Sequence, residues 1–93
     1  MEEGDPLEGL SRRAAGSPFA PPLKRSVTIA GHQTAISLEP IFWEALRAEA
    51  GKAGLPVNAL IARIDLARLS ADPAPNLGSA IRCWLFDRLF GSR

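Results

Sequence analysis

The hydrophobic pattern changes its period within the segment "HQTAISLEPIFWEAL", residues 32–46. Over residues 33–38 polar and apolar side chains alternate, which is the period of two expected of a half-buried strand. Beyond the Glu-Pro pair the period lengthens, because Phe42, Leu46 and Ala50 recur every fourth residue and lie on one stripe of a helix. A strand this short is not stable by itself, and we therefore expect another segment to pair with it.

The segment before this strand carries a second alternation. In "KRSVTIAG" the apolar side chains of Val27 and Ile29 alternate with hydroxyl side chains, which makes the segment a candidate strand. Gly31-His32 can then turn the chain, and residues 33–38 would be the second arm of a hairpin.

Three helices are predicted after the strand. The first covers residues 40–53, with Pro40 in the first turn and Gly54 as a left-handed stop. The second covers residues 57–69, and "SADPAP" ends it. Asn76 or Ser79 can cap a third helix that reaches about residue 90. The expected apolar faces are Leu60, Ile61, Ile64 and Ala67 or Arg68 in the second helix, and Leu77, Ile81, Trp84, Leu85 and Leu89 in the third.

The first 23 residues show no apolar period. They combine four prolines with glycine, serine and acidic residues, a composition that cannot bury enough apolar surface to offset the entropy of ordering. We expect residues 1–23 to be a disordered tail and residues 24–93 to form one mainly α domain with a short β-ribbon. A core of this size needs additional burial from elsewhere.

The single cysteine and the single histidine exclude several kinds of site. Cys83 has no second cysteine for a disulfide or a metal cluster, and we expect a buried thiol. His32 lies in a predicted turn, and no phosphate loop or catalytic grouping accompanies it, so we expect no enzyme, no metal and no cofactor. Without a disulfide or a metal cluster, oligomerisation remains as the way to stabilise the domain.

Asp65 interrupts the apolar side of the second helix, where we expect it to pair with Arg82 or to accept a hydrogen bond from Trp84.

Charge is unevenly distributed along the chain. Residues 1–22 hold four acidic residues against two arginines, and the rest holds nine basic residues against six acidic ones, although the net charge is only +1. The folded part is mildly basic, which is compatible with nucleic acid but is a weak signal. No run of about 18 apolar residues predicts a membrane span, and the start lacks the pattern of a secretory signal, so we expect a cytoplasmic protein.

The string "TAISLEPIFWEALRAEAGKAGLPVNALIARI" resembles the ribbon-helix-helix DNA-binding domain of the Arc, MetJ and CopG type. In this resemblance "TAISL" is the ribbon, "PIFWEALRAEAGKA" the first helix, "GL" the tight turn and "VNALIARI" the second helix. Together with "KRSVTIAGHQ" and the later "NLGSAIRCWLFDRL", the chain is similar to a bacterial subfamily of short ribbon-helix-helix proteins over about residues 24–90.

The resemblance implies an intertwined homodimer, with an extra N-terminal strand and a third C-terminal helix as additions to the family's fold. The strand would pair antiparallel with the same strand of a second chain, above four interlocked helices, so each chain would complete the other. Alternation would turn Thr34, Ile36 and Leu38 toward the helices. The implied dimer core is Ile36, Leu38, Phe42, Leu46, Leu60, Ile61 and Ile64.

The resemblance also implies that the outward side of the ribbon enters the major groove of double-stranded DNA. Gln33 could make a bidentate contact with adenine, and Ser37 could contact a base edge or a phosphate. Ala35 departs from the family's polar or basic reader and can offer only apolar contact to a thymine methyl group. The plainer alternative is that these side chains are simply the solvated side of a sheet.

A second departure lies at the start of the second helix, where Pro56 replaces the family's usual Ser or Thr cap. The N–H groups of Val57 and Asn58 would still point out of the helix end, where the dipole favours a phosphate. The alternative is that Asn58 caps this helix.

The candidate first strand raises a steric problem. If residues 27–30 paired with residues 33–38 in both chains, the dimer would have four strands about 4.8 Å apart, too wide with side chains for a groove about 12 Å wide. Either the segment peels away and lets Lys24 and Arg25 grip phosphates as a flexible arm, or the wider sheet serves a different partner. An ordinary solvated pair is the plainer interpretation of Lys24 and Arg25.

The sequence therefore predicts a homodimeric DNA-binding transcriptional regulator, a repressor or autorepressor without enzyme activity. The alternative is a protein-interaction module of antitoxin-like type, in which the dimer and the C-terminal helix mainly hold a protein partner.

Overall fold

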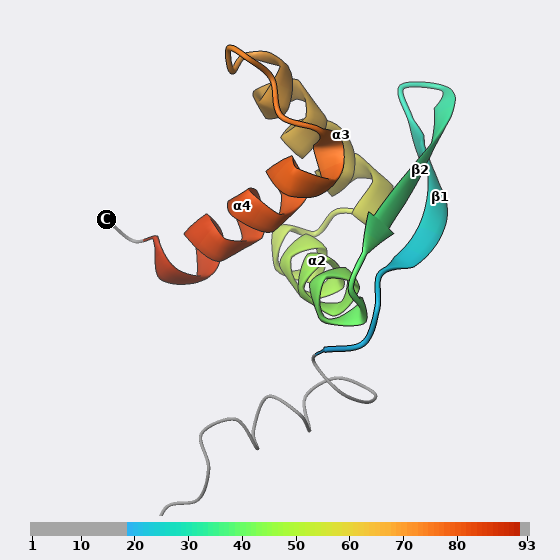
Figure 1. Cartoon of the computed structure of the whole chain (residues 1–93), viewed down its shortest axis with the longest axis vertical. Helices are drawn as coiled ribbons and strands as arrows, with labels where there is room; N and C mark the ends of the chain where they lie inside the picture. The colour runs from blue at the N-terminus through green and yellow to red at the C-terminus, as the bar shows by residue number, and fades with distance from the viewer. Residues whose placement is uncertain (1–18, 92–93) are drawn as a thin grey trace, which may run out of the picture.

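The computed structural model describes residues 19–91, which form a two-stranded hairpin beside three helices (Figure 1). The elements in chain order are β1 (Leu23–Ile29), β2 (His32–Leu38), α2 (Pro40–Ala53), α3 (Val57–Leu69) and α4 (Leu77–Phe90). The predicted mainly α fold, with a short β-ribbon, an extra N-terminal strand and a third C-terminal helix, is confirmed. Most of the tail expected over residues 1–23 lies outside the described residues, and Leu23 is already the first residue of β1.

β1 and β2 form an antiparallel hairpin whose seven positions are all paired. The connecting loop is Ala30-Gly31, with φ of 51° and 82°. Two successive positive φ angles give a turn whose twist matches that of the flanking strands. The turn therefore lies one residue earlier than the predicted Gly31-His32, because His32 is already paired in β2.

Alternation decides which side of the hairpin is buried. Val27 and Ile29 of β1, and Ile36 and Leu38 of β2, are buried against the helices, whereas the residues between them are exposed or half-buried. The inward side predicted for β2 is confirmed, including the half-buried Thr34. β1 follows the same rule, because the two strands share one pleated sheet.

The helix boundaries follow from local signals. Pro40 occupies the first turn of α2, and Gly54 ends the helix with a left-handed φ of 69°. The Asn76 side chain caps α4 by accepting from the backbone N–H of Ser79 at 2.8 Å. These predicted starts and stops are confirmed.

The buried face of α2 differs from the predicted stripe. Leu46 and Ala50 are buried as expected, but Phe42 is only half-buried and its neighbour Trp43 is buried instead. Trp43 can be buried because its indole N–H has a hydrogen-bond acceptor on β1. Glu49 is also buried, with 7% of its surface exposed, which the apolar pattern did not predict.

Two expectations for polar residues are wrong. Cys83 is exposed, because α4 turns Ile81 and Leu85 toward the core and leaves Cys83 outside that face. Asp65 accepts from the Nε and Nη2 atoms of Arg68 at 2.9 and 2.7 Å, one turn along α3, and not from either expected partner on α4. Arg68 is within reach because residues three apart are neighbours on a helix surface.

The core lies between the hairpin and the three helices. Six of the residues expected in a dimer core are buried within the single chain, namely Ile36, Leu38, Leu46, Leu60, Ile61 and Ile64. β1 supplies β2 with a partner inside its own chain. Within residues 19–91, no helix is long and apolar enough to cross a membrane.

Candidate nucleic-acid interface

The outward side of the hairpin carries six exposed side chains in two rows, which we call the ribbon face. Because the strands are antiparallel, the rows stand in register as cross-strand pairs, and the members of such pairs lie about 5 Å apart at their Cβ atoms. The pairs are Lys24 with Ser37, Ser26 with Ala35, and Thr28 with Gln33.

The ribbon face consists almost entirely of groups that can contact nucleic acid. Its three hydroxyl groups can both donate and accept, and the Gln33 amide can do both at once, which suits an adenine edge. Lys24 adds a positive charge that can neutralise a phosphate. Ala35 offers only a methyl group, and none of the six side chains is acidic. This surface can therefore hydrogen-bond to DNA without repelling the phosphates.

The sequence predicts the β2 row of the ribbon face but gives no role to Ser26 and Thr28 on β1. The signal was present, because both alternate with the apolar residues Val27 and Ile29. Only the paired register places them opposite Ala35 and Gln33 and so adds them to one continuous surface.

Arg25 lies on the other side of the hairpin from its neighbour Lys24. Its guanidinium carbon is 5.5 Å from the centroid of the Trp43 ring, a cation–π contact that joins β1 to α2. The indole N–H of Trp43 also donates to the Leu23 carbonyl at 2.9 Å. The segment is thus a packed strand in this structure, and not a flexible arm, and Lys24 and Arg25 face different surroundings.

The start of α3 has no side-chain cap. Pro56 occupies the N-cap position, and its carbonyl accepts from the N–H groups of Ala59 and Leu60 at 3.0 and 3.2 Å. The alternative in which Asn58 caps the helix is therefore wrong. The N–H groups of Val57 and Asn58 belong to the first turn, where a helix provides no carbonyl for them and its dipole favours an anion.

Arg82 of α4 holds the junction between β2 and α2. Its Nε and Nη2 atoms donate to Glu39 Oε1 at 3.1 and 3.0 Å, and Nη2 also donates to the Ser37 carbonyl at 3.4 Å. The backbone N–H of Glu39 and the Arg82 side chain lower the pKa of the Glu39 carboxyl, against the opposing effect of burial. The pair therefore stays ionised at neutral pH and ties the end of the ribbon to α4.

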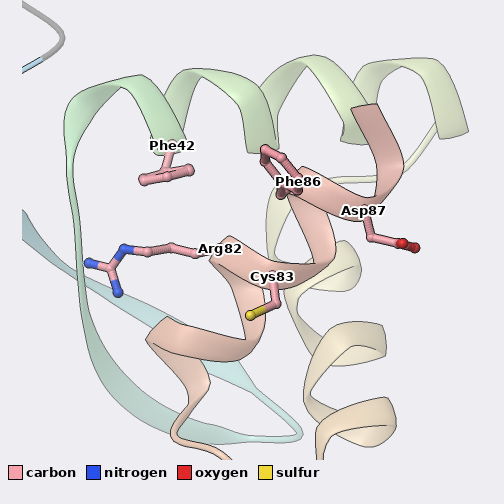
Figure 2. Close-up of a pocket in the computed structure, with 5 residues that line it drawn as sticks. All are labelled: Phe42, Arg82, Cys83, Phe86 and Asp87. Atoms are coloured by element: carbon pink, nitrogen blue, oxygen red, sulfur yellow. The ribbon is translucent and has the colours of Figure 1, made fainter. Parts of the chain in front are cut away.

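A second surface is an apolar groove between α2 and α4, which we call the α2/α4 groove. Figure 2 shows one hollow of this groove, with Phe42 on α2 and the side chains of α4 across from it. Phe86 and Phe90 are 64% and 69% exposed, and their ring centroids are 4.7 Å apart. The groove is lined in its first hollow by Phe42, Arg82, Cys83, Phe86 and Asp87, and in its second by residues that include Ile41, Phe42, Ala45, Ala48, Leu85, Leu89 and Phe90.

Glu49 lies at the edge of the α2/α4 groove and links the two helices. Its carboxylate accepts from Lys52 Nζ at 3.2 Å and from Arg88 Nε at 3.2 Å. Burial on its own would raise the pKa of Glu49, but the hydrogen bonds and charges of Lys52 and Arg88 outweigh burial and lower it. The buried carboxylate is thus ionised and paired.

The described part of the chain, residues 19–91, contains no group of three or more His, Cys, Asp or Glu side chains that could hold a metal ion. His32 is exposed at the start of β2.

A family model described as a ribbon-helix-helix domain matches residues 22–89 of the chain, which include every strand and nearly all of every helix described above. Domains of this family are generally DNA-binding regulators and typically form homodimers. No curated protein and no solved structure matches the chain.

Proposed function

Because the chain belongs to the ribbon-helix-helix family, we propose that it is a sequence-specific DNA-binding transcriptional regulator. In this proposal it is a repressor or autorepressor without enzyme activity, acting as a homodimer in the bacterial cytoplasm. The observation that carries the proposal is the ribbon face, which is exposed, rich in hydrogen-bonding groups and free of acidic side chains. It lies on the β-ribbon, the element after which the family is named.

Each residue of the proposed interface has a role that its chemistry permits. Gln33 reads an adenine edge, Ala35 contacts a thymine methyl group, and Ser37 donates to a base or a phosphate. Lys24 neutralises a phosphate. The first turn of α3, at residues 57–58, binds a second phosphate through its backbone N–H groups. Arg25 supports the ribbon through Trp43.

The test of this proposal is the substitution Gln33→Ala, measured with a duplex selected by the wild-type chain from a random-sequence pool. The variant should lose about 1 to 3 kcal/mol of binding to that duplex, because a bidentate base contact contributes about this much discrimination. Binding to a scrambled duplex should barely change, since non-specific binding depends on phosphate contacts.

The matched control is His32→Ala, which removes the neighbouring exposed side chain on the opposite parity of β2. It should bind both duplexes as the wild type does. If the wild-type chain selects no duplex, the proposed regulator function is contradicted. If both variants lose the same affinity for the selected duplex, Gln33 is not a base reader.

We further propose that a second copy of the chain covers the α2/α4 groove. Phe86 and Phe90 expose an apolar surface on neighbouring turns of one helix, and contiguous exposed apolar surface marks interaction sites. The groove is bordered by both acidic and basic side chains, so its charge favours a copy of itself over a strongly acidic or basic partner. A two-fold contact can place each charge against an opposite one on the copy.

The same observation supports a second candidate function, the protein-interaction module. An exposed groove between two helices can accept an amphipathic helix of another protein. A measurement of self-association distinguishes the dimeric regulator from the protein-interaction module, because a chain that remains monomeric leaves the α2/α4 groove open for a different partner.

A further inference from the structure

We propose that Arg82 is a positioning residue for DNA reading, because it fixes the end of the ribbon face relative to the helices. This inference rests on the proposed function and adds a residue that acts without contacting DNA itself. It gives helix α4, which follows the ribbon and the first two helices, a part in sequence recognition.

The junction between β2 and α2 is a single residue. β2 ends at Leu38 and α2 begins at Pro40, so the angle between the ribbon and the helices depends on the backbone of Glu39. Leu38 is fully buried, which holds this end of the strand against the core. The Glu39 side chain does not cap α2. A rotation at Glu39 would therefore turn the ribbon face relative to the phosphate-binding turn of α3.

Arg82 contacts both sides of this junction. Its Nε and Nη2 atoms donate to Glu39 Oε1 at 3.1 and 3.0 Å, and Nη2 also donates to the Ser37 carbonyl at 3.4 Å. Figure 2 shows the Arg82 side chain extending from α4 toward the chain that joins β2 to α2. Its guanidinium carbon is also 5.7 Å from the centroid of the Phe42 ring. Because a guanidinium presents its donors in one rigid plane, it fixes these groups relative to one another.

The first turn of α4 approaches the same end of the ribbon. A Cβ atom added at Gly78 would lie 3.7 Å from the Ser37 carbonyl oxygen and 3.6 Å from Arg82 Nη1. The Asn76 side chain caps this turn. Arg82 thus reaches the ribbon from a helix whose start is itself held in contact with β2.

The end of the ribbon that Arg82 holds carries part of the proposed DNA contact. Ser37 is the outward residue nearest the junction, and it stands opposite Lys24. Phosphate contacts position a protein on a duplex and base contacts read the sequence, so both must fit at once. If the ribbon turned relative to α3, residues 57–58 could still bind a phosphate while Gln33 missed its base. Loss of Arg82 should therefore reduce sequence discrimination more than general affinity.

The experiment compares Arg82→Gln with Arg88→Gln in the full chain. The two arginines are closely matched, because Arg88 also lies on α4, donates to Glu49 at 3.2 Å and lies 5.2 Å from the centroid of the Trp84 ring. Both of these partners belong to helices and neither belongs to the ribbon. Arg88→Gln therefore removes the same kinds of contact without releasing the junction.

Arg82→Gln should weaken binding to the duplex selected by the wild type by roughly tenfold, within the range of one lost base contact. Binding to a scrambled duplex should change by less than about twofold, and the salt slope should stay the same, because Arg82 neutralises no phosphate. Arg88→Gln should bind both duplexes as the wild type does.

A second variant, Glu39→Ala, distinguishes positioning from charge. It removes an acidic side chain beside the ribbon face, so an effect of charge alone would strengthen binding to every duplex. Positioning predicts the opposite for the selected duplex, namely a loss similar to that of Arg82→Gln. The double variant should lose no more than either single variant, because both changes remove the same interaction. Glu39 does not line the α2/α4 groove, so this loss does not depend on self-association there.

Amide hydrogen exchange tests the junction without DNA. The N–H groups of Phe42 and Trp43 donate to the Glu39 carbonyl at 2.8 and 3.2 Å, so their exchange reports local opening of the junction. Exchange at these two residues should be faster in Arg82→Gln and unchanged in Arg88→Gln. Wild-type exchange in Arg82→Gln would overturn the inference and leave the proposed function intact.

The binding data can overturn the inference in two further ways. The first is an equal loss on the selected and scrambled duplexes in Arg82→Gln, or a loss of the same size in Arg88→Gln. The second is tighter binding of Glu39→Ala to both duplexes. If the wild type selects no duplex at all, the proposed function fails, and the positioning role fails with it.

Discussion

Lys24 and Arg25 are neighbours in the chain with the same charge, yet the strand turns them to opposite sides. Lys24 belongs to the ribbon face opposite Ser37, and Arg25 rests on the Trp43 ring. Two adjacent basic residues in a sequence need not form one phosphate-binding pair, because successive side chains of a strand point in opposite directions. The two residues should therefore respond differently to substitution.

We predict that Lys24→Ala weakens binding to every duplex by a similar factor and makes the salt slope shallower by about 0.9 per chain, the contribution of one neutralised phosphate. Arg25→Ala should leave the salt slope unchanged and lower the melting temperature, because it removes the contact with Trp43. Binding of specific and scrambled duplexes across a salt series measures the first effect, and thermal unfolding the second. A change of slope in Arg25→Ala would place that side chain on phosphate instead.

Glu49 makes stability depend on pH in a predictable direction. Its pKa is lower in the folded chain than in the unfolded chain, so the unfolded state binds more protons as the solution is acidified. The stabilisation is complete above the ordinary glutamate value of about 4.3 and is lost as pH falls through the lowered pKa.

We predict that the melting temperature of the wild type falls more steeply below about pH 4.3 than that of Glu49→Gln, which has no charge to lose. Glu44→Gln, an exposed change on the same helix, is the control and should follow the wild type. Parallel curves for the wild type and Glu49→Gln would show that the pairs with Lys52 and Arg88 contribute little.

At the scale of elements, helix α4 is the addition to the ribbon-helix-helix arrangement, and its start depends on one side chain. Asn76 accepts from the N–H of Ser79 at 2.8 Å. Asn76→Ala should destabilise the chain by about 1 kcal/mol, the usual contribution of an N-cap. Ser79→Ala is the matched control, since Ser79 contributes its backbone N–H and not its hydroxyl to this bond. Equal stability of both variants in denaturant unfolding would show that packing alone sets the start of α4.

A hydrophobic period can predict where a helix forms without predicting which of its side chains are buried. The period in α2 predicts a helix of the correct length, but it predicts Phe42 and not Trp43 as the buried aromatic residue. The helix packs against the hairpin, α3 and α4, so its buried arc is set by three neighbours. A single stripe cannot describe a helix packed in this way.

At the scale of the whole molecule, the structure changes the surface at which we expect self-association. The short strand and the small core predict that a second chain supplies additional burial. In the structure, β1 pairs with β2 along its full length and the core closes within one chain. What remains open is the α2/α4 groove. We therefore expect self-association to depend on the aromatic residues of α4 and not on the edge of β2.

The double substitution Phe86→Ser with Phe90→Ser should shift the protein from dimer to monomer in sedimentation at micromolar concentration. Leu66→Ser, which alters an equally exposed apolar side chain on α3, should leave the dimer intact. Cys83 provides an independent readout, because it lines the same groove and should react with a thiol reagent more slowly in the dimer.

A dimer that survives the double substitution would show that copies associate through another surface. A wild-type chain that is monomeric at all concentrations would instead favour the protein-interaction module, with the α2/α4 groove as the surface for its partner.

The sequence alone determined the order, type and approximate limits of the elements. Alternation marked both strands, Pro40 and Gly54 delimited α2, and Asn76 marked the start of α4. These features depend on residues a few positions apart, whose steric and hydrogen-bonding preferences act locally. The outward row of β2 could be assigned for the same reason, because strand parity is a local property.

Only the tertiary structure decided how these elements use one another. It paired β1 with β2 along their full length, and it placed Arg82 against Glu39, 43 positions away in the chain. It also left Cys83 outside the core and buried Glu49 between two basic partners. Such outcomes depend on which faces meet when the whole chain packs, and no local period encodes that choice.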